Sequence, residues 1–111
     1  MTTKELYDAL YASGLPVVYY AWKEGAAPEL PYICYFFPQS DNFGADNSVY
    51  VPANRLYVEL YTKDKDFATE EQVEAVLGDI CGYWNKSETY IESESMYQIL
   101  YESEVILSNG E

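Results

Sequence analysis

The chain has 111 residues, with 6 Lys and Arg, 19 Asp and Glu and no His, so its formal net charge is −13. Without His it lacks the commonest general base and the commonest metal ligand, and so few cations argue against a broad grip on nucleic-acid phosphates. The length predicts a single domain over residues 1–111, and the 49% hydrophobic fraction with 13 Tyr excludes a disordered acidic tail.

A helix is predicted over residues 3–12, because Thr2 and Glu5 have the spacing of a capping box. Strands are predicted over 17–22 and 32–37, since both stretches are rich in β-branched and aromatic residues. The segment between the two strands is loop-like, which favours a hairpin with a long tip. The second strand is apolar on both faces, which predicts a central strand or one that is covered on both sides.

The middle of the chain begins with a polar, turn-rich segment over 39–47, which predicts an exposed loop with Phe43 at its tip. A short extended piece is expected over 48–51. The clearest strand is predicted over 55–63, where leucine and valine alternate with polar and aromatic residues and should meet the core. The opposite face of that strand carries Tyr57, Glu59 and Tyr61.

A second helix is predicted to start near Thr69, which has capping-box spacing to Gln72. Its glutamates at 70, 71 and 74 suit the positive end of the helix dipole. Apolar residues then recur at steps of three and four, which predicts one buried face. They are Val73, Val76, Leu77, Ile80, Cys81 and Trp84. Strands over 89–94 and 97–107 are predicted to complete the chain.

The element order is therefore α-β-β-β-α-β-β, without the alternation of strand and helix that builds a parallel sheet. This order predicts an α+β fold: an antiparallel or mixed sheet of about five strands, with two helices packed on one face.

Acidic residues are the most frequent candidates for chemistry, but they form no recognisable catalytic site. Glu92, Glu94, Glu102 and Glu104 have strand spacing on two consecutive strands, which is best explained as the solvated face of a hairpin. No nucleophile with an activating base is present. The Asp and Asn residues over 41–47 do not match the spacing of a calcium loop. We therefore predict no catalytic residue, no metal site, no cofactor and no enzymatic activity.

Cysteine usage and hydropathy bear on the compartment. Cys34 and Cys81 lie in apolar runs and are interpreted as buried thiols. No N-terminal apolar run has the length of a signal peptide, and no stretch approaches the ~20 residues of a membrane span. We expect synthesis in the cytoplasm and no contact with a membrane.

The high tyrosine content is the remaining unexplained feature. Most of the tyrosines lie on or beside predicted strands. Half of the side chains of a strand point away from the core, so some of these rings should lie on an outer face. Tyrosine is enriched at protein–protein interfaces because it offers apolar area with a polar tip. The candidate interface residues are Phe43, Tyr50, Tyr57, Tyr61, Glu92 and Glu94.

Three phrases of the sequence carry a resemblance to a known family: residues 45–50 (ADNSVY), residues 57–66 (YVELYTKDKD) and residues 90–99 (YIESESMYQI). They resemble the tail terminator, or tail-to-head joining, proteins of siphophages and prophages of Gram-positive bacteria. The resemblance extends over nearly the whole chain in length and element order.

The resemblance implies a structural protein of the virion neck or tail, made in the bacterial host cytoplasm. It implies self-assembly into a ring, typically a hexamer, that caps the finished tail tube. The partners implied are the tail tube protein and a head-completion or connector protein. DNA would pass through the lumen without specific binding, and no cofactor is implied.

Two alternatives stay open. The first is another head–tail connector or head-completion protein, although adaptors of that kind tend to be more helical. The second belongs to a different class: an acidic inhibitor that mimics DNA, for which the net charge and the glutamates of the last two strands are the supporting features.

Overall fold

Five strands form a mixed sheet in the order β1-β2-β5-β7-β6, in which β1 and β2 are parallel and the other neighbours antiparallel. This computed structural model describes residues 1–45 and 48–108, and for 43–45 and 48–51 it describes the backbone alone. The sheet strands are β1 (Val17–Tyr19), β2 (Tyr32–Phe36), β5 (Ala53–Thr62), β6 (Asn85–Ile91) and β7 (Met96–Ile106). The helices are α1 (Thr3–Tyr11), α2 (Phe67–Ile80) and the short 3₁₀ turn η1 (Glu92–Glu94).

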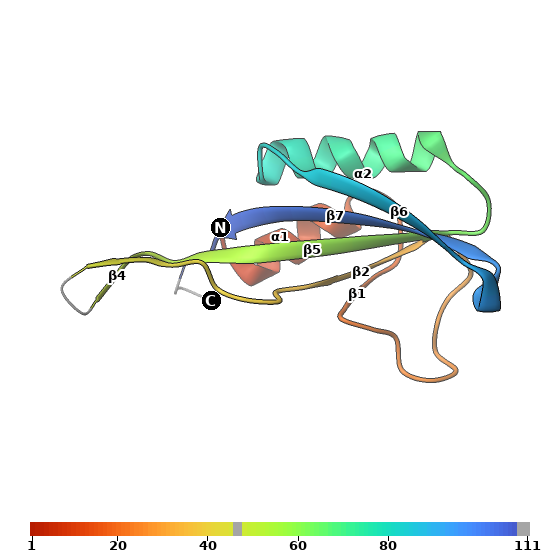
Figure 1. The fold of residues 1–111 in the computed structure, drawn as a ribbon, viewed down its shortest axis with the longest axis horizontal. Helices are drawn as coiled ribbons and strands as arrows, with labels where there is room; N and C mark the ends of the chain where they lie inside the picture. The colour runs from red at the N-terminus through yellow and green to blue at the C-terminus, as the bar shows by residue number, and fades with distance from the viewer. Residues whose placement is uncertain (46–47, 109–111) are drawn as a thin grey trace.

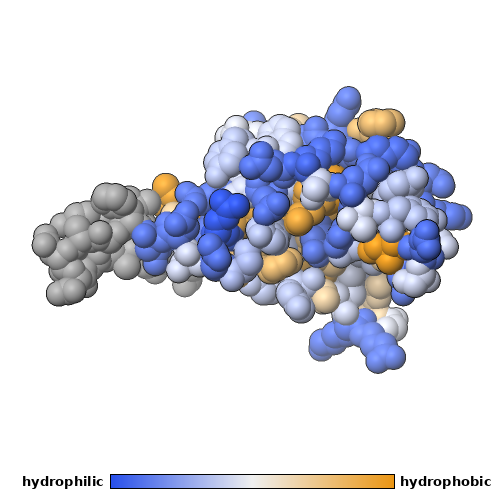
Figure 2. All heavy atoms as spheres, viewed as in Figure 1, coloured by the Kyte–Doolittle hydropathy of each residue, from blue (hydrophilic) through white to orange (hydrophobic). Residues whose placement is uncertain are grey.

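One hydrophobic core lies between the two helices and one face of the sheet (Figure 1). Strands β1, β2, β5 and β7 contribute residues at alternate positions, as the period of two requires, whereas the residues of β6 are exposed or half-buried. The fully buried members include Leu6, Leu10, Ile33, Leu56, Leu60, Val73, Leu77, Ile99 and Tyr101. The predicted α+β class, element order and one-sided helix layer are therefore confirmed. In the described part of the chain, no helix has the length and apolar character needed to cross a membrane. The outer surface, seen in the same view as Figure 1, is mostly hydrophilic (Figure 2).

Helix α1 begins as the sequence predicts. The Thr2 side chain accepts a hydrogen bond from the Glu5 amide at 3.0 Å, and the Glu5 carboxylate accepts one from the Thr2 amide at 2.8 Å. This reciprocal pair satisfies two of the backbone donors that a helix start leaves free. The helix thereby directs Leu6 and Leu10 into the core.

The predicted hairpin between the first two strands is wrong, because β1 runs parallel to β2. Strand β1 ends at Tyr19, and Tyr20 has a φ of +68°, which turns the chain out of the sheet. Residues 20–31 then return to the starting end of β2. They supply the roughly one dozen residues that a parallel connection requires. The strand predicted over 17–22 is accordingly only half as long.

An arm of two antiparallel strands, β3 (Phe43–Ala45) and β4 (Ser48–Val51), replaces most of the loop predicted over 39–47. Among the described residues, β3 and β4 pair only with one another, and the arm projects from one end of the molecule (Figure 1). Phe43 starts β3 opposite Val51 rather than lying at a loop tip, so that prediction is wrong. The extended piece predicted over 48–51 is confirmed as β4.

Helix α2 starts two residues earlier than predicted, and its N-cap is Asp66 rather than a Thr69 capping box. The Asp66 carboxylate accepts from the Thr69 amide at 3.1 Å and from the Thr69 hydroxyl at 2.6 Å. An Asp at the N-cap serves as well as a Thr, so spacing alone misplaces the start. The helix ends at Ile80. Trp84 therefore lies beyond it, although its ring still packs against the core.

A buried carboxylate links α2 to the sheet, although its place in the first helical turn suggests only an interaction with the helix dipole. Glu70 is 1% exposed, and its two oxygens pair with Lys65 at 2.6 Å and with Lys86 at 2.7 Å. Lys86 also contacts Glu74 at 2.7 Å, and Glu74 accepts a hydrogen bond from the Tyr101 hydroxyl at 2.8 Å. Burial would raise the pKa of Glu70, but the hydrogen bonds from both lysines outweigh it and hold that pKa below its ordinary value.

The last two strands form a hairpin with an earlier boundary than predicted. Strand β6 ends at Ile91, and Glu92 and Glu94 lie in η1, followed by Ser95 at a φ of +52°. In β7 the inward row continues through Ser103 to Val105, both buried. A row of four glutamates on one hairpin face therefore does not form, because two of them sit in the connecting turn.

Candidate interaction surface

The sheet face opposite the helices carries aromatic and acidic side chains. On β2 the residues that alternate with the core are Tyr32, Cys34 and Phe36. On β5, the register places Tyr61 opposite Tyr32, Glu59 opposite Cys34 and Tyr57 opposite Phe36. We call this surface the open face. Its members are buried or half-buried side chains on the side of the sheet that faces away from α1 and α2.

Ring contacts run across the open face in two short rows. In one row, Tyr20 lies 5.4 Å from Phe36 and Phe36 lies 5.4 Å from Tyr57, between ring centroids. In the other, Trp22 lies 5.7 Å from Tyr32, which lies 5.4 Å from Tyr61. Edge-on and tilted ring pairs at this separation are mutually favourable and rigid. Both rows offer a large aromatic surface to a partner. Because the rings already pack against one another, they would lose little conformational entropy when a partner binds.

A polar cluster sits beside the second row. The Tyr61 hydroxyl donates to Glu59 at 3.1 Å, and the Gln98 amide donates to Glu59 at 3.2 Å and to the Tyr61 hydroxyl at 2.9 Å. Burial raises the pKa of Glu59, and it raises that of Tyr61 far above the ordinary tyrosine value. Burial also raises the pKa of the adjacent Cys34 thiol to about 11, so this thiol is protonated and unreactive at neutral pH.

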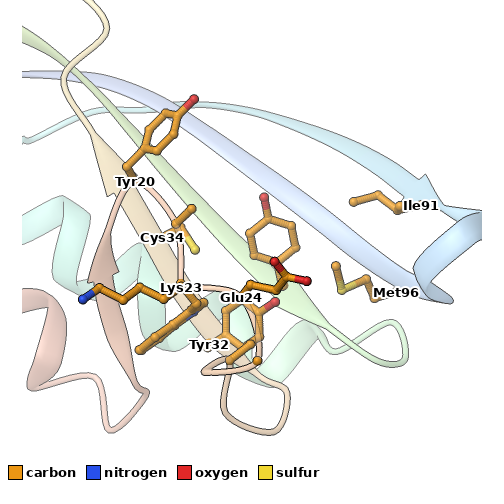
Figure 3. Close-up of a pocket in the computed structure, with 12 residues that line it drawn as sticks. Tyr20, Lys23, Glu24, Tyr32, Cys34, Ile91 and Met96 are labelled. Carbon is orange, nitrogen blue, oxygen red and sulfur yellow. The ribbon is translucent and has the colours of Figure 1, made fainter.

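Residues 20–31 fold past the edge of this surface and form one wall of an open pocket of about 370 Å³ (Figure 3). The sheet contributes Tyr32, Cys34 and Tyr61, and Ile91 and Met96 close one side. The connecting segment contributes residues 20–25 and Ala27. The pocket therefore exists because β1 and β2 are parallel, since a tight hairpin would leave no segment to form this wall.

The six interface residues named from the sequence fall in three places. Tyr57 and Tyr61 lie on the open face, half-buried, as their strand alternation predicts. Glu92 and Glu94 are exposed in η1. Phe43 and Tyr50 belong to β3 and β4 of the arm, and their side chains lie outside the described residues. The two tyrosines thus share one face of β5, in different ring rows, and the two glutamates lie apart from them in η1.

Four residues of the surface were missed by sequence reasoning: Tyr20, Trp22, Glu24 and Tyr32. Trp22 was assigned to a strand and Glu24 to a plain loop. The parallel connection that places them over the sheet has no local signal in the sequence. The aromatic content of residues 19–22 was the available hint, since a short strand rarely needs three aromatic rings.

No metal-binding chemistry accompanies this surface in the part of the chain that the structure describes. Groups of three or more His, Cys, Asp or Glu side chains suited to an ion are absent there. Cys34 and Cys81 are both free thiols, buried and half-buried respectively. The open face presents aromatic rings and a hydrogen-bonded polar cluster, which are groups suited to contact with another molecule.

The sequence matches no known family model, and no curated protein sequence matches it. The fold is similar to that of a chain in the virion of a native gene transfer agent particle. The two chains superpose with a TM-score of 0.60 and 16% sequence identity, over 91% of this chain and 91% of the other. At that identity the similarity shows a shared fold, covering nearly the full length of both.

Proposed function

We propose that this protein is a structural component of a phage or phage-like particle, acting in the neck or tail as a tail terminator. The observation that carries the proposal is the shared fold with a chain of a gene transfer agent virion, over 91% of both chains. The resemblance of the strand phrases to tail terminators supports the same role. In this role the chain assembles into a ring, typically a hexamer, that caps the tail tube and meets a head connector.

Two features of the fold suit a ring subunit. Strands β1 and β6 are the two edges of the sheet, so each has an unpaired backbone edge within its own chain. The arm projects beyond the sheet and pairs only with itself among the described residues, and isolated two-stranded hairpins are marginal in water. A neighbouring subunit that packs on the arm would stabilise it. Two different surfaces that meet head to tail are what a closed ring requires.

The DNA-mimic alternative loses its main support in this fold. A mimic needs carboxylates at phosphate-like spacing on one exposed face, and Glu92 and Glu94 lie in η1 while Glu102 and Glu104 lie far along β7. From Met96, next to η1, to Glu102 the strand rises about 20 Å. Glu104 also lies opposite Arg55 in the register. These four glutamates therefore do not form an array on one exposed face.

Loss of the gene gives the sharpest test of the proposed role. We expect particles without this protein to carry tail tubes of irregular, excessive length, seen by negative-stain electron microscopy, and a plasmid copy to restore uniform tails. Tails of normal length that fail to attach to heads would instead assign the protein to another connector position. Normal, attached tails would reject a neck role altogether.

Replacing Phe43 by alanine should weaken assembly while leaving the fold intact, because β3 lies in the projecting arm. We expect a melting temperature within about 2 °C of the wild type, since substitutions outside the core usually cost little. Complementation of tail joining should fall. The matched control is Phe67→Ala, which removes an aromatic ring that is 67% exposed on α2. A melting temperature several degrees lower, with normal tail joining, would assign Phe43 to the core instead.

A further inference from the structure

The pocket beside the open face combines aromatic rings with acidic groups. Four rings line it, from Tyr20, Trp22, Tyr32 and Tyr61. Its volume of about 370 Å³ lies at the small end of the range for ligand sites, which suits one side chain or a small group. Rings that line a small pocket attract cations through the negative faces of their π-systems.

The carboxylate of Glu24 has no partner of its own. Within the part of the chain that the structure describes, it makes no hydrogen bond and no ion pair. Figure 3 shows it extending into the pocket, whereas the ammonium of Lys23 points away. The residues that line the pocket include one cation, Lys23, and one anion, Glu24, and the carboxylate alone is directed into the pocket.

Further negative charge lies close to the same rings. Glu59 accepts from the Tyr61 hydroxyl at 3.1 Å and forms part of the sheet beneath. Glu94 in η1 is near enough to Tyr32 for its charge to act on that hydroxyl. The net charge of the whole chain, −13, adds to the negative electrostatic potential at this pocket. The electrostatic complement of such a site is a positively charged group.

We propose that this pocket binds a basic side chain, an arginine or a lysine, presented by a segment of a partner protein. The Trp22 and Tyr32 rings would contact the alkyl stem and the face of the cation, and Glu24 would pair with its charge. Neither aromatic rings nor one exposed carboxylate suffices alone, since exposed ion pairs contribute little. Together they distinguish a basic side chain from an apolar one and from an acidic one.

The inference goes beyond the neck role and stands apart from it. It concerns which side chain a partner presents, whatever particle or complex the partner belongs to. Absence of peptide binding would leave the expected tail length unchanged, and tails of normal length would leave the expected peptide binding unchanged.

Three capped tripeptides serve as probes: Ac-Gly-Arg-Gly-NH2, Ac-Gly-Lys-Gly-NH2 and the neutral Ac-Gly-norleucine-Gly-NH2. Each is titrated into the ¹⁵N-labelled full chain at physiological salt, followed by amide and indole chemical shifts. We expect saturable shifts at Trp22, Tyr32 and Met96 with a basic peptide, and binding at least about fivefold weaker with norleucine. Comparison of the Arg and Lys peptides shows whether a guanidinium or an ammonium is preferred.

Two variants keep the test specific. Glu24→Gln should weaken binding of the basic peptide about threefold or more, and Trp22→Leu about three- to fivefold. The matched control is Glu71→Gln, which removes the same charge from an exposed position on α2 and should leave binding unchanged. Thermal melts establish that each variant is folded. Equal binding of norleucine, equal effects of Glu24→Gln and Glu71→Gln, or no saturable shift up to high millimolar peptide would each overturn the proposal.

Discussion

Replacing Tyr101 by alanine lowers the free energy of unfolding by about 4 kcal/mol, the largest effect we expect from a single substitution. Its ring is fully buried on β7, between β5 and β6 and under α2. Truncation leaves a cavity in the middle of the sheet, and it also leaves Glu74 without the 2.8 Å hydrogen bond from the Tyr101 hydroxyl. In a domain of this size the change should lower the melting temperature by well over 10 °C.

Tyr101→Phe separates the two contributions. It keeps the ring and removes only the hydroxyl, so we expect a loss of about 1 kcal/mol, because Glu74 retains its contact with Lys86 at 2.7 Å. Urea unfolding of both variants measures the difference. If the phenylalanine variant proves as unstable as the alanine variant, the ring is not packed as the structure shows and the hydrogen bond dominates.

Glu70→Gln should cost about 2–3 kcal/mol, although a surface glutamate on a helix normally contributes little. The carboxylate is 1% exposed and forms ion pairs with both Lys65 and Lys86. The amide cannot do so, but Lys65 keeps Glu88 and Lys86 keeps Glu74, which limits the loss. Glu71→Gln, one residue away and exposed, is the matched control and should change stability by less than about 0.5 kcal/mol.

The contribution of Glu70 should depend on pH in a defined direction. Its pKa is lowered in the folded protein, so its stabilisation is fully present above the unfolded-state pKa of about 4.3 and is lost as the pH falls through the folded pKa. The difference in unfolding free energy between wild type and Glu70→Gln should therefore be largest near neutral pH and shrink as the pH falls below the unfolded-state pKa. A difference that stays constant over this range would show that Glu70 acts through packing rather than charge.

Local patterns in the sequence were sufficient for the core and for most element types. Leu56, Val58 and Leu60 alternate as a half-buried strand must, and the capping box at Thr2 and Glu5 marks the start of α1. Each of these signals depends on residues within a few positions of one another. The structure confirms them because local geometry and tertiary packing agree there.

The errors arise where distant segments decide the outcome. The parallel direction of β1 depends on where residues 20–31 are held, and the burial of Glu70 on α2 depends on Lys86, a residue of strand β6. A glutamate in the first turn of a helix is normally explained by the dipole, so no local signal separates Glu70 from its exposed neighbour Glu71. The pocket could not be predicted from the sequence for the same reason, because its two walls come together only through the parallel pairing of β1 with β2.

The short parallel strand β1 also sets the order in which parts of the molecule open. Its ladder with β2 is closed by the amides of Tyr20 and Ile33, which donate to the carbonyls of Tyr35 and Pro16 at 2.7 and 2.8 Å. Strands β5 and β7, by contrast, pair over ten positions in the sheet centre. Amide exchange at Tyr20 should therefore run ahead of exchange in β5, through local fraying at the sheet edge. Residues 20–31 follow β1 directly and form one wall of the pocket. Fraying of β1 therefore releases this wall while the hydrogen bonds between β5 and β7 stay closed.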